Sequence, residues 1–149
     1  MIRLSGGCLC GSIRYKILQE PLLAYTCNCR FCQKDTGTAY RSALAILNEN
    51  VELSGKKLSI YTYKSGEHGR ELYKNFCSDC GTTISLKTER FPERQVIMIG
   101  TLDDPSQITL NTHMFVEEAL DWVEFPKEHV AYARHRINED GTPATPINK

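Results

Sequence analysis

Short stretches of alternating apolar and polar residues dominate the chain. Residues 12–17 read Ser-Ile-Arg-Tyr-Lys-Ile and residues 58–63 read Leu-Ser-Ile-Tyr-Thr-Tyr, with the period of two that half-buried strands show. The same pattern, in whole or in part, predicts strands at 41–47, 51–53, 71–76, 82–87, 95–99 and 108–116. Glycine, asparagine, aspartate and proline stand between many of these stretches, where turns are expected. The pattern predicts a mainly β fold of short antiparallel strands, arranged as a sandwich or a pair of sheets.

Helix is expected at only two places. One is a short turn from Arg30 to Thr36, which Gly37 would end, and the other is a helix around residues 128–137. From Asn138 onward the chain is mostly polar residues, glycine and proline, so residues 138–149 are expected to be a flexible C-terminal tail. The length of 149 residues suits one domain, which we expect to span residues 1–137.

Charge and hydropathy exclude several classes of function. Lysine plus arginine and aspartate plus glutamate each total 18, so no basic excess indicates nucleic acid as a partner. No apolar stretch approaches the roughly 20 residues of a membrane helix. The first residues contain no apolar segment of the kind that a secretory signal carries. We therefore expect a cytoplasmic protein without nucleic-acid or membrane partners, and no pattern indicates an oligomeric state.

Seven cysteines are the most informative residues of this chain. The number is odd, and structural disulfides are rare in a reducing compartment, so disulfides are a poor explanation. The cysteines fall into three groups, each of which can direct two or three sulfur atoms at one point, as tetrahedral zinc requires. The groups read Cys8-Leu9-Cys10, Cys27-Asn28-Cys29-Arg30-Phe31-Cys32 and Cys77-Ser78-Asp79-Cys80.

Glycine follows the last cysteine of the two outer groups, at Gly11 and Gly81, and is absent after the middle group. This shared feature favours one closed, structural zinc site on the outer groups, although spacing alone leaves other pairings open. The middle group would then supply three thiolates and leave one zinc position for a ligand, as catalytic sites do, with a thiol as the best-matched ligand. Two purely structural zinc ions are the alternative. A thioredoxin-like redox pair is disfavoured, because no βαβ pattern surrounds either Cys-x-x-Cys motif. The outer set is Cys8, Cys10, Cys77 and Cys80, and the middle set is Cys27, Cys29 and Cys32.

Together with the cysteine groups, several further motifs resemble the glutathione-dependent formaldehyde-activating enzyme and centromere protein V family. The matching segments lie at 7–15, 27–32, 76–82, 100–105 and 113–116. The resemblance implies a β-tent fold stapled by a structural zinc on the outer cysteines, with a second, catalytic zinc on the middle ones. It also implies carbon–sulfur lyase activity, joining formaldehyde and glutathione into S-hydroxymethylglutathione. The sequence departs from the family at Asn28 and Gln33, where histidine and arginine are common.

A few other residues are candidates for the site. His113, at a position that matches the family, can act as an outer-shell donor, a proton carrier or, less commonly, a zinc ligand, although a histidine on a strand is more often simply packed. Asn28, Arg30 and Lys34 are candidate substrate contacts. The three cations that flank the motif, Arg30, Lys34 and Arg41, can hold the carboxylates of a glutathione-like thiol, although solvated surface charge is the more common role of such residues. The leading hypothesis is a zinc-dependent carbon–sulfur lyase with two zinc ions and a thiol such as glutathione. Its rivals are a non-catalytic zinc module that binds a partner, and a labile thiol cluster that buffers metal or redox state.

Overall fold

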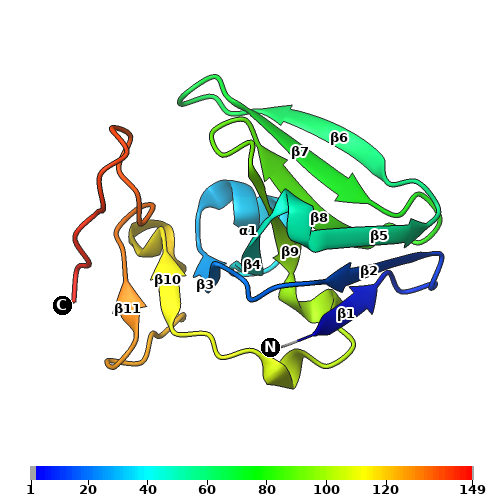
Figure 1. Ribbon diagram of the computed structural model, residues 1–149. Coiled ribbons are helices and arrows are strands. Elements are labelled where there is room, and N and C mark those ends of the chain that lie inside the picture. The colour runs from blue at the N-terminus through cyan, green and yellow to red at the C-terminus, as the bar shows by residue number, and fades with distance from the viewer. Residues whose placement is uncertain (1–2, 149) are drawn as a thin grey trace. The chain divides into compact units, whose positions relative to one another are not determined.

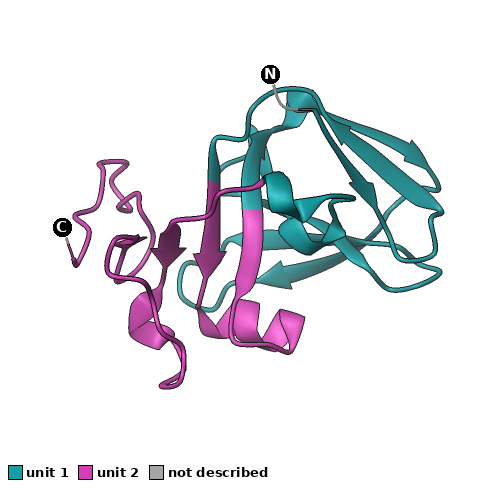
Figure 2. Ribbon diagram, turned by 90° about the horizontal axis from the view of Figure 1, so that it is seen from below, with its two compact units in different colours: residues 1–23, 44–107 teal, residues 24–43, 108–149 magenta. Residues whose placement is uncertain are grey.

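The computed structural model describes residues 3–148, and Figure 1 labels its helices and strands. The described chain divides into two compact units, residues 1–23 with 44–107 and residues 24–43 with 108–149 (Figure 2). The strands are β1 (Leu4–Gly7), β2 (Ile13–Ile17), β3 (Leu23–Cys27), β4 (Arg41–Leu47), β5 (Val51–Gly55), β6 (Ser59–Lys64), β7 (Glu71–Phe76), β8 (Thr83–Thr88), β9 (Arg94–Met98), β10 (Thr112–Met114) and β11 (Val130–Ala131). The α-helix is α1 (Arg30–Thr36), and the short 3-10 helices are η1 (Asn48–Asn50), η2 (Ile99–Thr101), η3 (Pro105–Gln107) and η4 (Val116–Glu118).

The first unit contains a three-stranded antiparallel sheet in the order β1-β2-β5. In β2 the side chains of Ile13, Tyr15 and Ile17 are buried while the two basic residues between them are exposed. This alternation is the one that the sequence pattern predicts, and burial of the three apolar side chains is what favours the pairing. The Tyr15 hydroxyl reaches Thr101 Oγ1 at 2.7 Å, so its polar end is paired.

The same unit also holds an antiparallel run in the order β6-β7-β8-β9, and β9 neighbours β4. The buried side chains of Ile46, Ile84 and Ile97 belong to this part of the core. The β7–β8 pairing shifts register between Asn75 and Phe76. Such an irregularity bends a strand locally, and here it stands directly before the turn that carries Cys77.

The second unit contains strands that pair in parallel. β10 lies between β3 and β11 and is parallel to both, with His113 opposite Thr26 and Met114 opposite Cys27. Helix α1 follows β3 almost directly. Its first turn is capped by the Cys29 side chain, and Gly37, with φ of 73°, ends it in the left-handed conformation. The unit thus carries the middle cysteine group on one continuous strand-turn-helix segment.

The mainly β fold is confirmed. Strands occur within all the stretches where alternation predicts them, and the helical turn from Arg30 to Thr36 ends at Gly37 as expected. Three strands, β1, β3 and β11, lie outside the predicted strand stretches, and the stretch at 108–116 forms a strand only over Thr112–Met114. The sheets are also mixed, because the pairings of β10 are parallel where antiparallel strands are expected.

The prediction of a helix around residues 128–137 is wrong. The segment instead contains β11, where Val130 N donates to Asn111 O at 2.8 Å and Tyr132 N donates to His113 O at 2.9 Å. The β-branched and aromatic residues Val130 and Tyr132 suit an extended backbone. Pairing with β10 therefore outweighs a weak local preference for helix.

The single domain over 1–137 and the flexible tail over 138–149 stay predictions. Within the tail, Ala144 N donates to Arg136 O at 2.9 Å and Ile147 N donates to Ala131 O at 2.8 Å. Among residues 3–148, none of the helices has the length and hydropathy that crossing a membrane requires.

Candidate metal centres

Four cysteines of the first unit meet at one point, and we call them the four-cysteine cluster. Their sulfur atoms all lie within 4.8 Å of one another, with Cys8 to Cys10 at 3.6 Å and Cys10 to Cys77 at 3.8 Å. No disulfide joins the cysteines of the described chain. Metal–sulfur bonds of about 2.3 Å in a tetrahedron place the sulfur atoms about 3.8 Å apart. The spacing in this cluster therefore suits a tetrahedral ion. Its members are Cys8, Cys10, Cys77 and Cys80.

Two tight turns present these four sulfur atoms. In the turn between β1 and β2, Gly11 N donates to Cys8 O at 3.1 Å, and in the turn between β7 and β8, Gly81 N donates to Cys77 O at 2.8 Å. Gly11 and Gly81 have φ values of 82° and 77°, which disfavour any side chain. The glycine that follows each outer group in the sequence is thus required by the shape of the turn.

Hydroxyl and amide groups surround the sulfur atoms of the four-cysteine cluster. Ser12 Oγ lies 3.1 Å from Cys10 Sγ and 3.3 Å from Cys77 Sγ, and Thr82 Oγ1 lies 3.2 Å from Cys80 Sγ. The Thr82 contacts help to lower the pKa of Cys80 to about 5. Burial raises the pKa of Cys8, but hydrogen bonds from Ile13 N and neighbouring side chains outweigh it and lower the value to about 7. These donors favour the thiolate forms that bind metal ions.

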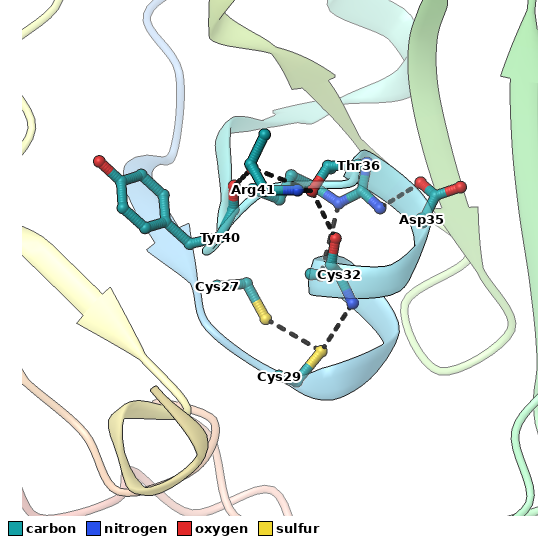
Figure 3. A network of polar contacts seen from close by, with 8 residues as sticks. Cys27, Cys29, Cys32, Asp35, Thr36, Tyr40 and Arg41 are labelled. Carbon is teal, nitrogen blue, oxygen red and sulfur yellow. Dashed lines mark hydrogen bonds and ion pairs between the residues drawn. The ribbon is translucent and has the colours of Figure 1, made fainter. Parts of the chain in front are cut away.

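The second group is the three-cysteine cluster of Cys27, Cys29 and Cys32, whose sulfur atoms also lie within 4.8 Å of one another. Cys27 ends β3, Cys29 caps α1 and Cys32 lies in its first turn, so six consecutive residues form the group (Figure 3). Cys27 Sγ donates to Cys29 Sγ at 3.5 Å, and Cys32 N donates to Cys29 Sγ at 3.4 Å. Cys27 and Cys32 are buried while Cys29 is partly exposed. Solvent therefore reaches the cluster on the side of Cys29.

The three thiols of this cluster differ in their pKa. Hydrogen bonds from the Cys27 and Cys32 side chains and from Cys32 N lower the pKa of Cys29 to about 3. The contacts with Cys29 and Cys32, together with burial, raise the pKa of Cys27 well above its usual value. Three adjacent sulfur atoms do not all ionise without a cation beside them. A positive ion bound between the three sulfur atoms would favour ionisation of all three.

Two further side chains of α1 and β4 contact the three-cysteine cluster or its backbone. Arg41 is buried, and its Nε donates to Cys32 Sγ at 3.4 Å (Figure 3). Gln33 is buried as well, and its Nε2 donates to Asn28 O at 2.8 Å and to Glu118 O at 3.0 Å. From the sequence, Arg41 was a candidate only for the carboxylates of a thiol, and Gln33 had no assigned role. A polar residue on a predicted helix, one position after a metal-ligand motif, is the signal that could have identified Gln33.

His113 belongs to neither cluster. Its Nδ1 lies 2.7 Å from Thr26 Oγ1, and its Nε2 lies 2.9 Å from His129 Nδ1. Asn28 is fully buried, and its amide nitrogen donates to Thr26 Oγ1 at 3.2 Å and to Met114 O at 3.0 Å. The structure thus places His113 two hydrogen bonds from the Asn28 amide, on the strand beside the one that ends at the three-cysteine cluster.

Arg30 and Lys34 are both exposed on α1. The Arg30 guanidinium donates to Gln33 Oε1 at 2.5 Å, and Arg30 N donates to Glu118 Oε1 at 3.2 Å. Asn28 differs from these two cations, since its side chain is buried and both of its N–H donors reach protein acceptors. Asn28 Oδ1 is the buried side-chain polar atom without a hydrogen-bond partner within the described residues.

The fold and the two sites therefore define the class of protein. It is a small, mainly β protein with two cysteine clusters able to hold metal ions. The chain belongs to the glutathione-dependent formaldehyde-activating enzyme family, whose sequence profile matches residues 3–118. None of the curated proteins compared with the chain matches it. Among solved structures, a crystal structure of a Rhodobacter sphaeroides protein, determined as a structural genomics target, is similar with a TM-score of 0.53. It is 20% identical, and the match covers 69% of this chain and 93% of that one, which shows the shared fold.

Proposed function

We propose that this protein binds one zinc ion at each cysteine cluster and uses the three-cysteine cluster to make or break a carbon–sulfur bond in a thiol adduct. The observation that carries the proposal is the size of that cluster. Within residues 3–148, the group of mutually close ligand atoms there has three members, all of them cysteine sulfurs. Tetrahedral zinc takes four ligands, so a three-member group leaves a position for a substrate.

The donor set supports zinc. Thiolates are soft ligands that select zinc, copper(I) or iron–sulfur clusters, and closed four-sulfur sites are common structural zinc sites. The four-cysteine cluster fills the coordination sphere and joins two turns that are distant in the sequence, β1–β2 and β7–β8. Its role is therefore structural. Because a metal bound only by the folded chain stabilises it, removal of this ion should unfold the first unit.

When bound at the three-cysteine cluster, zinc would offer one open position that suits a soft sulfur ligand better than water. The residues of the chain hold the three donors in place and keep Cys27 and Cys32 away from solvent. In the proposed reaction the thiol sulfur bonds to the carbonyl carbon, the carbon–oxygen π bond breaks, and the thiol proton ends on the new hydroxyl. The reverse reaction cleaves the same carbon–sulfur bond.

The family description supports glutathione and formaldehyde as the substrate pair. We assign Arg30 and Lys34 to the carboxylates of the thiol, because both are exposed cations on the helix that contains Cys32. Asn28 would offer its buried Oδ1 as a hydrogen-bond acceptor. His113 would position Asn28 through Thr26, whose hydroxyl contacts both residues. Seven unpaired cysteines also favour a reducing compartment, so we place the activity in the cytoplasm.

Metal analysis and exchange kinetics test the proposal. We expect wild-type protein, purified without chelator, to hold two zinc ions per chain and Cys29→Ser to hold one. We also expect wild type, and not Cys29→Ser, to accelerate exchange between free thiol and its formaldehyde adduct, followed by magnetisation transfer in NMR. One zinc ion per chain in both proteins would refute the proposal that the three-cysteine cluster binds a second zinc ion. Two zinc ions without faster exchange would reduce the protein to a non-catalytic zinc module.

The substrate contacts have a separate test. Replacing Arg30 or Lys34 with alanine should raise KM for glutathione and leave KM for 2-mercaptoethanol unchanged, because that thiol has no carboxylate. Equal effects on both thiols would show that these cations do not bind a carboxylate.

A further inference from the structure

Arg41 is a buried cation that divides its hydrogen bonds between a carboxylate and a sulfur of the three-cysteine cluster. Its side chain is 2% exposed. Nη2 pairs with Asp35 Oδ2 at 2.5 Å, and Nε donates to Cys32 Sγ at 3.4 Å (Figure 3). A buried guanidinium is costly unless opposite charge and hydrogen bonds satisfy it. Asp35, itself 12% exposed, supplies one such partner, and the Cys32 sulfur supplies another.

Several groups hold the guanidinium in one orientation. The carboxylate of Asp35 fixes one side of the planar fork, and the Phe31 ring lies below it with its centroid 5.8 Å from the Arg41 Cζ. Asp35 and Phe31 both belong to α1, the helix that carries Cys32. The direction of the Nε–H bond toward sulfur is therefore set by the same helix that positions the sulfur. Lysine carries three donors on one rotatable ammonium and has no planar guanidinium, so it would not reproduce this geometry.

The charge of the cluster explains why such a residue is useful. Three thiolates around a dication carry a net charge of minus one in a buried setting, where unpaired charge is unfavourable. The guanidinium, which Asp35 also shares, offsets that excess in part and does so directly at the Cys32 sulfur. A donor to a metal-bound sulfur also withdraws electron density from it, because the same lone pairs serve the metal and the hydrogen bond.

We propose that Arg41 is a positioning residue of the three-cysteine cluster, which orients Cys32 Sγ, increases the affinity of the cluster for a divalent metal and weakens the donation of that sulfur to the ion. Asp35 acts through Arg41 by fixing the orientation of its guanidinium. The proposal rests on the proposed function, which places a metal ion at this cluster. The competing explanation is a purely structural Arg41–Asp35 ion pair that lies beside the cluster by chance.

Cobalt(II) spectroscopy separates these explanations. Protein holding one zinc ion per chain is titrated with cobalt, so that the second ion reports on the three-cysteine cluster. Arg41→Met should bind that ion about 10- to 100-fold more weakly, as is typical when an outer-shell partner is lost. The sulfur-to-cobalt charge-transfer band should also move to lower energy, because the sulfur lone pairs lose a stabilising positive neighbour. A structural ion pair would change stability without moving this band.

The control is Arg134→Met, since Arg134 also pairs with a carboxylate, Glu117 at 3.3 Å, and has the Phe115 ring 5.6 Å from its Cζ, although its side chain is half exposed. The control should keep both the wild-type affinity and the wild-type band. Arg41→Lys keeps the charge and serves if Arg41→Met fails to fold; it should still show a shifted band because the fork is lost. Wild-type affinity and band position in the folded Arg41 variants would overturn the proposal. Absence of a second metal in wild type would instead refute the proposed function.

Discussion

Gln33 is predicted to hold the loop of the three-cysteine cluster in shape. Its Nε2 donates to Asn28 O at 2.8 Å, between two of the cysteines, and to Glu118 O at 3.0 Å, while its Oε1 accepts from Arg30 at 2.5 Å. Gln33→Met keeps the volume of the side chain and removes these bonds. A hydrogen bond contributes about 0.5–1.5 kcal/mol net, and a buried carbonyl left without its donor costs more. We expect a loss of about 2–3 kcal/mol in the free energy of unfolding.

Urea denaturation, followed by far-UV circular dichroism, measures this loss. With an m-value of about 2 kcal/mol per M, the midpoint should fall by about 1–1.5 M. The matched control is Gln95→Met, because Gln95 is equally buried at 5% exposure and its Nε2 makes one bond, to Asn48 Oδ1 at 3.1 Å. The control should lose about 1 kcal/mol.

The comparison also tests the link to the metal site. Since Asn28 lies between Cys27 and Cys29, Gln33→Met should weaken metal binding at the three-cysteine cluster, and Gln95→Met should not. A midpoint for Gln33→Met within the error of wild type would refute the reasoning from the two backbone acceptors. A large loss of stability with unchanged metal affinity would show that the Gln33 hydrogen bonds do not affect the three-cysteine cluster.

Three further predictions follow from other contacts. Gly6→Ala should cost about 2–3 kcal/mol in thermal unfolding, because its methyl group would lie 2.3 Å from a backbone oxygen, whereas Gly100→Ala meets nothing within 4 Å and should be close to neutral. Burial, with the charge of a neighbouring histidine, lowers the pKa of His113, so the stability present above pH about 6.5 should fall as the pH drops through the folded-state pKa, and His113→Gln should flatten that part of a stability–pH curve. The pKa of Asp103 is lowered by Arg14, but both side chains are about half exposed, so Asp103→Asn should lower the melting temperature only slightly, and that contribution should vanish in wild type as acid protonates the carboxylate. An unaltered melting temperature for Gly6→Ala, an unchanged pH curve for His113→Gln, or a large loss of stability for Asp103→Asn would contradict the respective argument.

Local sequence determined the features that depend on neighbours in the chain. Alternation in β2 follows from burial of every second residue, and α1 begins at a capping cysteine and ends at Gly37 because both signals act within one turn. The glycines after Cys10 and Cys80 allow the positive φ of the two turns. The shared glycines favoured the two cysteine clusters that the structure contains, although spacing alone left other pairings open.

Tertiary structure decided what depends on residues far apart in the sequence. β1 contains two glycines and becomes a strand because β2 pairs with it, and β11 replaces an expected helix because β10 supplies its backbone partners. The contact of Arg41 with Cys32, rather than with a substrate carboxylate, exists because β4 brings the guanidinium beside α1. The His113 contacts with Thr26 and His129 likewise join separate segments. Periodicity and spacing report on neighbours along the chain, whereas these contacts arise only when the strands pair.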